Sequence, residues 1–192
     1  PSISCPDNIT VNNDQQECGA IVTYLPPVGT DNCSGAVTSR ITGPAPGTLF
    51  PVGTTTIIYQ VSDAAGNTAQ CSFNVTVVEN ENPSISCPDN ITVNTDAGIC
   101  GAAVDYTIPV NSDNCGVVDT TLITGFAPGS TFPVGTTTVT YQVSDAAGNT
   151  AQCSFTVTVI ENEDPAISCP DDITVSTEKG ISGNVDNYTI PI

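Results

Sequence analysis

The amino-acid sequence predicts an all-β fold built from tandem Greek-key β-sandwiches. Three observations support this prediction. A long internal repeat divides the chain, apolar and polar residues alternate with the period-2 pattern of half-buried strands, and Pro and Gly punctuate these runs at intervals of about ten residues. Thr, Val and Ile dominate the alternating segments, and no segment shows helical periodicity. Such a chain is most simply a series of two-sheet sandwiches.

The repeat sets the domain organisation. PSISCPDNITV begins at Pro1 and recurs at Pro83, and the similar PAISCPDDITV begins at Pro165, so the spacing is 82 residues each time. Residues 1–82 and 83–164 align without a gap and share 58 identities. We therefore expect one sandwich over residues 1–82, a second over residues 83–164, and the N-terminal part of a truncated third repeat over residues 165–192. We interpret the chain as a window from a longer array, with a short native C-terminal remnant as the alternative.

Comparison of the two full copies separates buried from exposed positions. Ile57, Tyr59 and Val61 stay apolar in the second copy, whereas the intervening Ile58 becomes Thr140. The first set is therefore expected to face the core. Residues 51–53 are expected to form a turn, and residues 63–67 a hairpin between the last two strands. In the first copy, strands are expected over residues 9–12, 19–25, 37–42, 48–50, 54–62 and 69–78, and the same pattern is expected in the second copy.

Composition excludes several classes of function. The 192 residues include 20 acids, two bases and no histidine, which gives a formal charge of −18. Without histidine no side chain has an ordinary pKa near neutrality, so we expect no enzymatic activity. Two bases cannot neutralise a phosphate backbone, which excludes nucleic acid as a partner. No apolar run reaches the roughly 20 residues of a membrane span, so we expect no membrane insertion in this segment.

The separated blocks CPDNITV, TDN and FPVGTTTIIYQVSDAAGNTAQCSFNVTV resemble the HYR (hyalin repeat) domain. The resemblance spans both full copies and the start of the third. It implies an immunoglobulin-like β-sandwich of extracellular and cell-surface proteins, used in adhesion or surface architecture, without catalytic residues. These repeats carry a second pair of cysteines beyond the pair common in HYR modules, and this extra pair resembles versions in bacterial surface proteins. A bacterial source is therefore expected.

Nine cysteines indicate an oxidising, extracellular setting, either secreted or at the cell surface. In the expected topology the first and last strands run side by side, which predicts the bridges Cys5–Cys71 and Cys87–Cys153. By elimination, Cys18 is expected to pair with Cys33, and Cys100 with Cys115. Cys169 has no expected partner, and Ser182 stands where the third copy would carry its second cysteine. Zinc is disfavoured, because the spacings lack close CxxC pairs and no histidine is present.

Acidic and amide side chains are expected to gather where one repeat meets the next. Two loops of the second repeat should lie beside the connector of residues 79–82, and their oxygens suit a hard cation such as calcium. The expected interdomain calcium ligands are Glu79, Glu81, Asn82, Asp113, Asn114, Asp145 and Asn149. In the alternative interpretation, these Asp and Asn residues bond their own turns, and the connector acids keep the array soluble and extended.

Together these features predict a non-enzymatic extracellular structural protein that forms a stalk, fibre or filament at a cell surface or in a matrix. Its expected partners are other copies or neighbouring repeats, through self-association. The alternative is an adhesin-type module that recognises a protein or carbohydrate through its end loops. The absence of tryptophan and the few aromatic residues in the loops weigh against this alternative.

Overall fold

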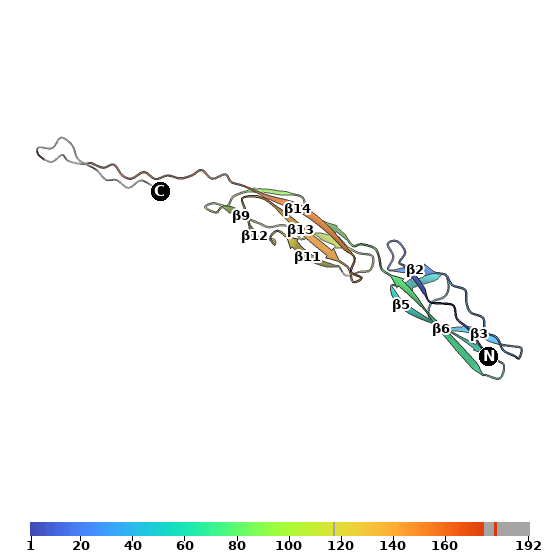
Figure 1. Cartoon of the computed structure of the whole chain (residues 1–192). Helices are drawn as coiled ribbons and strands as arrows, with labels where there is room; N and C mark the ends of the chain where they lie inside the picture. Colours follow the sequence, from blue (N-terminus) through green and yellow to red (C-terminus); the bar gives the residue numbers. More distant parts are fainter. Residues whose placement is uncertain (117, 175–178, 180–192) are drawn as a thin grey trace.

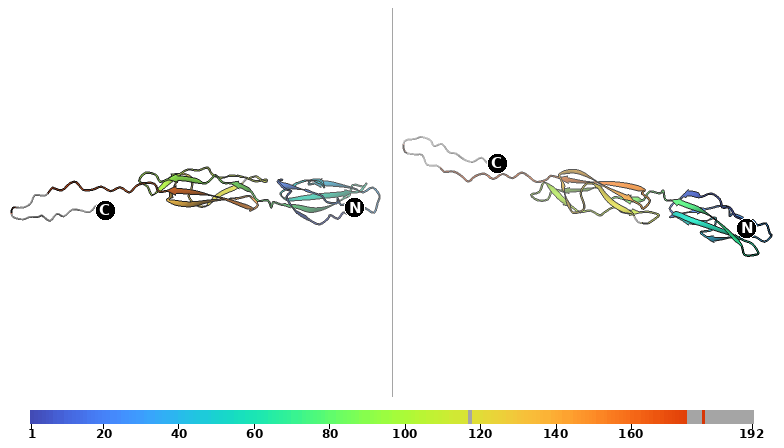
Figure 2. Two further views of the ribbon diagram at one scale, coloured as in Figure 1. Left: turned by 90° about the horizontal axis from the view of Figure 1, so that it is seen from above. Right: turned by 60° about the horizontal axis from the view of Figure 1, so that its bottom comes forward.

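The computed structural model describes residues 1–116, 118–174 and 179 and is all-β over these residues. The two full repeats form two elongated sandwiches placed end to end, with the N-terminus at the far end of the first (Figures 1 and 2). The described residues contain no helix long and apolar enough to cross a membrane. Within the described residues, the two sandwiches meet at a junction formed by one end of each.

The first repeat has two facing sheets. The larger has the strand order β1-β6-β5-β3, in which β1 is parallel to β6 and the other neighbours are antiparallel; the smaller pairs β2 with β4. A single bridge joins Ser2 and Thr30 at the N-terminal end. The strands are β1 (Ile9–Asn12), β2 (Gly19–Val22), β3 (Val37–Thr42), β4 (Thr48–Pro51), β5 (Gly53–Ser62) and β6 (Thr68–Val78).

The second repeat repeats this topology, with the order β11-β13-β14-β8 in the larger sheet and the pair β12-β9 in the smaller. The bridge of the first repeat is here extended to a short antiparallel pair, β7 with β10. The strands are β7 (Ser84–Ser86), β8 (Ile91–Asn94), β9 (Gly101–Val104), β10 (Val110–Ser112), β11 (Asp119–Thr124), β12 (Ser130–Pro133), β13 (Gly135–Ser144) and β14 (Thr150–Ile160).

Each sandwich has its own core, and both cores are small. In the first repeat Tyr24 contacts Phe50, Tyr59 and Phe73 edge-to-face, and its hydroxyl donates to the carbonyl of Pro44 at 3.0 Å. Phe50 is fully buried. Around this aromatic cluster lie mainly Val and Ile side chains from both sheets. The period-2 pattern therefore produces one apolar face on each sheet, and the two faces enclose a core without Trp or Met.

The expected all-β sandwich fold is confirmed, and the strands differ from expectation mainly at their ends. The strand expected over residues 19–25 stops at Val22, and Leu25 is exposed. Prolines at positions 26 and 27 follow, and proline cannot donate to a strand ladder. Of the expected third repeat, residues 165–174 form no regular strand, and the remainder except Lys179 lies outside the described residues.

A tight bend ends β11 of the second repeat at Gly125. Its φ is +90°, a region that L side chains rarely adopt. A Cβ at this position would lie 3.1 Å from the carbonyl oxygen of Thr138 and 3.0 Å from the Cα of Val139. Gly129 also has a positive φ, of +77°, but a Cβ there would meet nothing within 4 Å. A comparison of alanine substitutions at these two glycines therefore separates the energetic cost of a positive φ from the energetic cost of steric crowding.

We expect Gly125→Ala to destabilise the second repeat more than Gly129→Ala. The backbone strain common to both variants should cost about 1–2 kcal/mol. Crowding against the backbone of β13 should add at least about 1 kcal/mol for Gly125→Ala. Chemical denaturation followed by tyrosine fluorescence measures both values. Equal destabilisation by the two variants would show that the close approach of β11 to β13 carries no cost.

Candidate functional site

The candidate site is the junction between the two repeats. At the first repeat's C-terminal end it comprises the turn before β2, which contains Cys18, and the connector Glu79–Asn82 after β6. At the second repeat's N-terminal end it comprises the loop Asp113–Cys115 and the hairpin 145–149 between β13 and β14. The strand directions bring these four segments together, because β6 leaves the first repeat where β2 begins.

A disulfide between Cys18 and Cys115 crosses this junction, with a Cα–Cα distance of 4.8 Å. The expected pairings Cys18–Cys33 and Cys100–Cys115 are wrong, and Cys33 and Cys100 are exposed free thiols. The reason is the direction of β2, which starts near Cys18 and leads toward the opposite end of the sandwich, where Cys33 lies. Roughly a dozen residues in extended geometry span about 40 Å, whereas bridged cysteines need Cα atoms within about 7 Å.

The other two disulfides lie within the repeats. Cys5 pairs with Cys71, and Cys87 pairs with Cys153, which matches the expected pairings. Both join the segment before the first long strand to the last strand of the same repeat, where β1 and β8 run parallel to β6 and β14. Each such bridge restricts the unfolded chain and contributes about 2–4 kcal/mol. The structure therefore has one disulfide within each full repeat and a third disulfide between the two repeats.

Asn114 links the two repeats beside the junction disulfide. Its side-chain amide donates to the carbonyl oxygen of Glu17 at 3.0 Å and to Oε2 of Glu79 at 3.2 Å. The side chain of Glu79 is only 6% exposed, and its Oε1 accepts the backbone N–H of Glu81 at 2.6 Å. A buried carboxylate is stable only when its oxygens are hydrogen-bonded. Glu79 meets this requirement by bonding to both sides of the junction.

The connector is also fixed to the first repeat. Both carboxylate oxygens of Glu81 accept the backbone N–H of Gln16 at 3.0 Å. Asn13, which is 9% exposed, accepts the N–H of Asn80 at 3.1 Å and donates to the carbonyl of Glu17 at 3.2 Å. The four connector residues thus form part of the end surface of the first repeat rather than a free linker.

Six of the seven expected calcium ligands line two cavities at the junction. One cavity, of about 320 Å³, is lined by Glu79, Asp145 and the two bridged cysteines. The other, of about 340 Å³, is lined by Glu81, Asn82, Asp113 and Asn114. Asn149 is held within its own hairpin, where its side-chain amide donates to Oδ2 of Asp145 at 2.7 Å. The topology therefore divides six of these residues between two cavities and leaves Asn149 bonded to Asp145 beside one of them.

Most of these carboxylates already accept hydrogen bonds from N–H groups. Oδ1 of Asp145 accepts the backbone N–H of Gly148 and of Asn149, at 2.7 and 2.8 Å. Oδ2 of Asp113 accepts the N–H of Cys115 at 2.8 Å, whereas its buried Oδ1 has no hydrogen-bond partner among the described residues. Within the same residues, no group of three or more His, Cys, Asp or Glu side chains is arranged to hold a metal. Calcium binding stays a prediction.

The hairpin hydrogen bonds shift the acidity of two equivalent aspartates. At Asp63 the side-chain hydrogen bond from Asn67, with backbone N–H donors, holds the pKa below the ordinary 3.8. At Asp145 burial alone would raise the pKa, but hydrogen bonds from the side chain and backbone of Asn149 and from Gly148 outweigh it and lower the pKa. These bonds favour the charged form, so they stabilise each hairpin only while the carboxylate is ionised.

Comparison with known proteins identifies the family of both repeats. The HYR domain family model matches residues 1–77 and 78–159. Hyalin of Strongylocentrotus purpuratus is 37% identical over 198 aligned residues, covering 100% of this chain and 16% of that protein. Hyalin of Lytechinus variegatus is 35% identical and covers 95% of this chain and 36% of that protein.

A third relative is named after several types of domain. The mouse sushi, von Willebrand factor type A, EGF and pentraxin domain-containing protein 1 is 33% identical over 162 residues, which cover 83% of this chain and 4% of that protein. The chain thus spans a small share of these relatives. All three are animal proteins, so the expectation of a bacterial source finds no support in them. Together with the disulfide-stapled β fold, these relatives place the protein outside the cell.

Acidification should destabilise the hairpins through Asp63 and Asp145. Because their folded-state pKa values lie below 3.8, the stability they contribute is present above that pH and is lost as the pH falls through the lowered values. We expect the double variant Asp63→Asn, Asp145→Asn to melt at a lower temperature than the parent at neutral pH. It should then lose less melting temperature than the parent between about pH 7 and about pH 2. Equal losses in the two proteins would contradict the assignment.

The calcium prediction is tested by thermal melting. If calcium binds at the junction, millimolar calcium should raise the melting temperature of the parent protein by ligand linkage. Asp113→Asn, which removes the charge beside the unpartnered oxygen, should reduce that rise. The matched control is Asp31→Asn, the equivalent position at the N-terminal end of the first repeat. A melting temperature that does not change with calcium would contradict the prediction.

Proposed function

This chain belongs to the HYR family, and from that premise we propose that it is a non-enzymatic structural repeat protein that forms a stalk, fibre or filament at a cell surface or in a matrix. In this role the repeats act as spacers of fixed length and transmit mechanical tension along the chain. The Cys18–Cys115 disulfide carries the proposal, because it couples adjacent repeats covalently at a second point beside the connector. Two separate covalent links restrict rotation about the junction far more than one connector does.

The non-covalent contacts at the junction support the same role. Asn114 of the second repeat bonds to Glu17 and Glu79 of the first, next to the disulfide. The backbone N–H groups of Gln16 and Asn80 donate to Glu81 and Asn13, and these bonds hold the connector against the first repeat. A linker held in this way behaves as part of a rigid element rather than as a flexible coil. The end-to-end placement of the sandwiches then gives an extended rod (Figure 2).

Composition and charge support a structural rather than a catalytic role. The chain has no histidine and only two bases, so it has few groups for acid–base or anion chemistry. A formal charge of −18 makes parallel arrays repel one another, so we propose that self-association occurs along the array, with other copies or neighbouring repeats. An adhesin-type module with a protein or carbohydrate ligand is the competing function, and it requires binding by an isolated monomer.

The junction disulfide should determine how stiff the rod is. We expect Cys18→Ser, Cys115→Ser to fold, because each sandwich keeps its own core and its own internal disulfide. Small-angle X-ray scattering of this variant should give a broader distribution of interatomic distances and a smaller mean end-to-end length than the parent. The physical cause is the freedom to bend about the connector once only one covalent link remains.

The matched control is Cys33→Ser, Cys100→Ser, which replaces the equivalent cysteines that lie outside the junction. This control should scatter like the parent. If the junction variant also scatters like the parent, the disulfide does not set the stiffness, and the proposed rod loses its main support. Specific binding of a glycan or protein by monomers, without any stiffness effect, would favour the adhesin-type function.

A further inference from the structure

Both full repeats carry the same N-glycosylation sequence at the same position. Residues 8–10 and 90–92 both read Asn-Ile-Thr, which satisfies the pattern Asn-x-Ser/Thr with x other than proline. Asn32 and Asn74 begin two further matches in the first repeat, but the pattern is broken at the equivalent positions of the second repeat. The third copy has Asp172 where the first two have asparagine. Such matches arise easily in a chain rich in Asn and Thr, so the structure around each match decides which of them is a candidate site.

The hydrogen bonds of Asn8 and Asn90 use the oxygen of the side-chain amide and leave its nitrogen free. Oδ1 of Asn8 accepts the backbone N–H of Asn74 at 2.8 Å, and Oδ1 of Asn90 accepts that of Thr156 at the same distance. Among the described residues, neither Nδ2 donates a hydrogen bond. Because the nitrogen is the atom that carries an N-linked glycan, modification keeps the bond that positions the side chain.

Both asparagines are accessible to a bulky substituent. Asn8 and Asn90 are exposed, and so are the threonines that complete the two patterns, Thr10 and Thr92. Asn74 differs, since its side chain is half-buried and its Oδ1 accepts a hydroxyl from β5 at 2.9 Å. A glycan is large and hydrophilic and needs solvent around its attachment point. Asn8 and Asn90 provide such a point without the displacement of a packed side chain.

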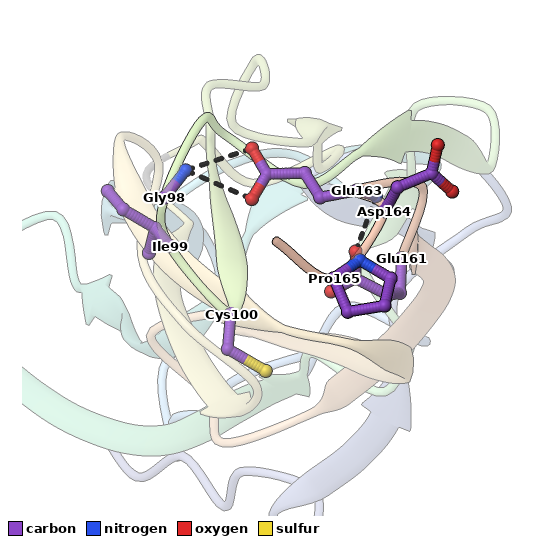
Figure 3. A pocket seen from close by; sticks show the side chains of 7 residues that line it. All are labelled: Gly98, Ile99, Cys100, Glu161, Glu163, Asp164 and Pro165. Atoms are coloured by element: carbon purple, nitrogen blue, oxygen red, sulfur yellow. Dashed lines mark hydrogen bonds between the residues drawn. The ribbon is translucent and has the colours of Figure 1, made fainter. Parts of the chain in front are cut away.

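The two asparagines also lie away from the end surfaces of the sandwiches. Each directly precedes an edge strand of the larger sheet, β1 or β8. The end surface begins after that strand, where Gln16 donates to Glu81 in the first repeat and Gly98 donates to Glu163 in the second (Figure 3). A strand of four residues spans about 13 Å. A glycan is therefore attached about one strand length from the end surface, and the junction contacts form with the glycan in place.

We propose that Asn8 and Asn90 each carry an N-linked glycan. The acceptor is the side-chain amide, and the donor is an oligosaccharide that is attached to a lipid through a pyrophosphate. Each repeat is then modified once at the start of its edge strand, on the side of the sandwich rather than at its ends. The proposal goes beyond the structural role and does not rest on it, because a secreted chain meets this donor whatever its later function.

The transfer is a substitution at the first sugar of the donor. The amide nitrogen of the asparagine attacks the anomeric carbon, a carbon–nitrogen bond forms, and the bond from that carbon to the pyrophosphate oxygen breaks. The lipid pyrophosphate leaves with the electron pair, and the amide nitrogen loses one proton. Nothing is oxidised or reduced. The hydroxyl two residues after the asparagine is part of the acceptor pattern, and Thr10 and Thr92 supply it.

Site-resolved mass spectrometry tests the proposal. The full chain is placed behind a secretion signal, expressed in animal cells and purified from the medium. Peptide N-glycosidase in heavy-oxygen water then converts each glycosylated asparagine to an isotope-labelled aspartate. We expect label at positions 8 and 90 of the parent. Thr92→Val should lower the label at position 90 at least about tenfold and leave position 8 unchanged, whereas Thr92→Ser, which keeps the pattern, should leave both labelled.

The threonine variants separate loss of the glycan from loss of the fold. Asn90→Gln would disturb the hydrogen bond to the N–H of Thr156, whereas Thr92→Val keeps it and places a good strand former at an exposed position. Position 8 of the same chain is an internal reference, and Thr10→Val should reverse the two roles. If the asparagines serve only as hydrogen-bond acceptors, the parent has no label at either position, which would overturn the proposal. Label at one of the two positions only, or label at position 90 that persists in Thr92→Val, would overturn it as well.

Discussion

The direction in which β2 and the segment after it cross the sandwich determines which cysteines can form disulfides. Because β2 starts at the C-terminal end of its sandwich and leads toward the N-terminal end, the two cysteines that flank this segment lie at opposite ends. Neither can reach the other, and Cys18 instead bonds to Cys115 of the second repeat. The same segment that builds the smaller sheet thus separates two cysteines and makes a disulfide between repeats possible.

A small core is sufficient in this architecture because one set of contacts stabilises each repeat and a second set joins the two repeats. Within a repeat, aromatic clusters around Tyr24 and Tyr106 and one disulfide hold the two sheets. Between repeats, the buried carboxylate of Glu79 and the junction disulfide hold two such units. Burial raises the pKa of Tyr106, whose hydroxyl bonds to the carbonyl of Phe126. The tyrosines therefore act as neutral core residues that also satisfy a loop carbonyl.

The sequence predicts most of the fold but only part of the site. Alternation and the internal comparison of the two copies locate the strands, since side-chain period and burial are local properties of a sheet. The structure places most of the expected acids and amides at the junction, and their role as calcium ligands stays a prediction. The pairing of Cys18 with Cys115 is missed because elimination considers cysteines of one repeat only. The needed signal is present, since a segment long enough to cross the sandwich separates Cys18 from Cys33.

The residue before β2 determines whether a junction of this kind can form a disulfide. It is Cys18 in the first copy and Cys100 in the second, and the sequence has Ser182 at this position of the third, which lies outside the described residues. A serine cannot form the disulfide that Cys18 forms with Cys115. In the proposed structural role, a junction after such a repeat would have its connector as the only covalent link, so we expect it to bend more easily than the junction between the first two repeats.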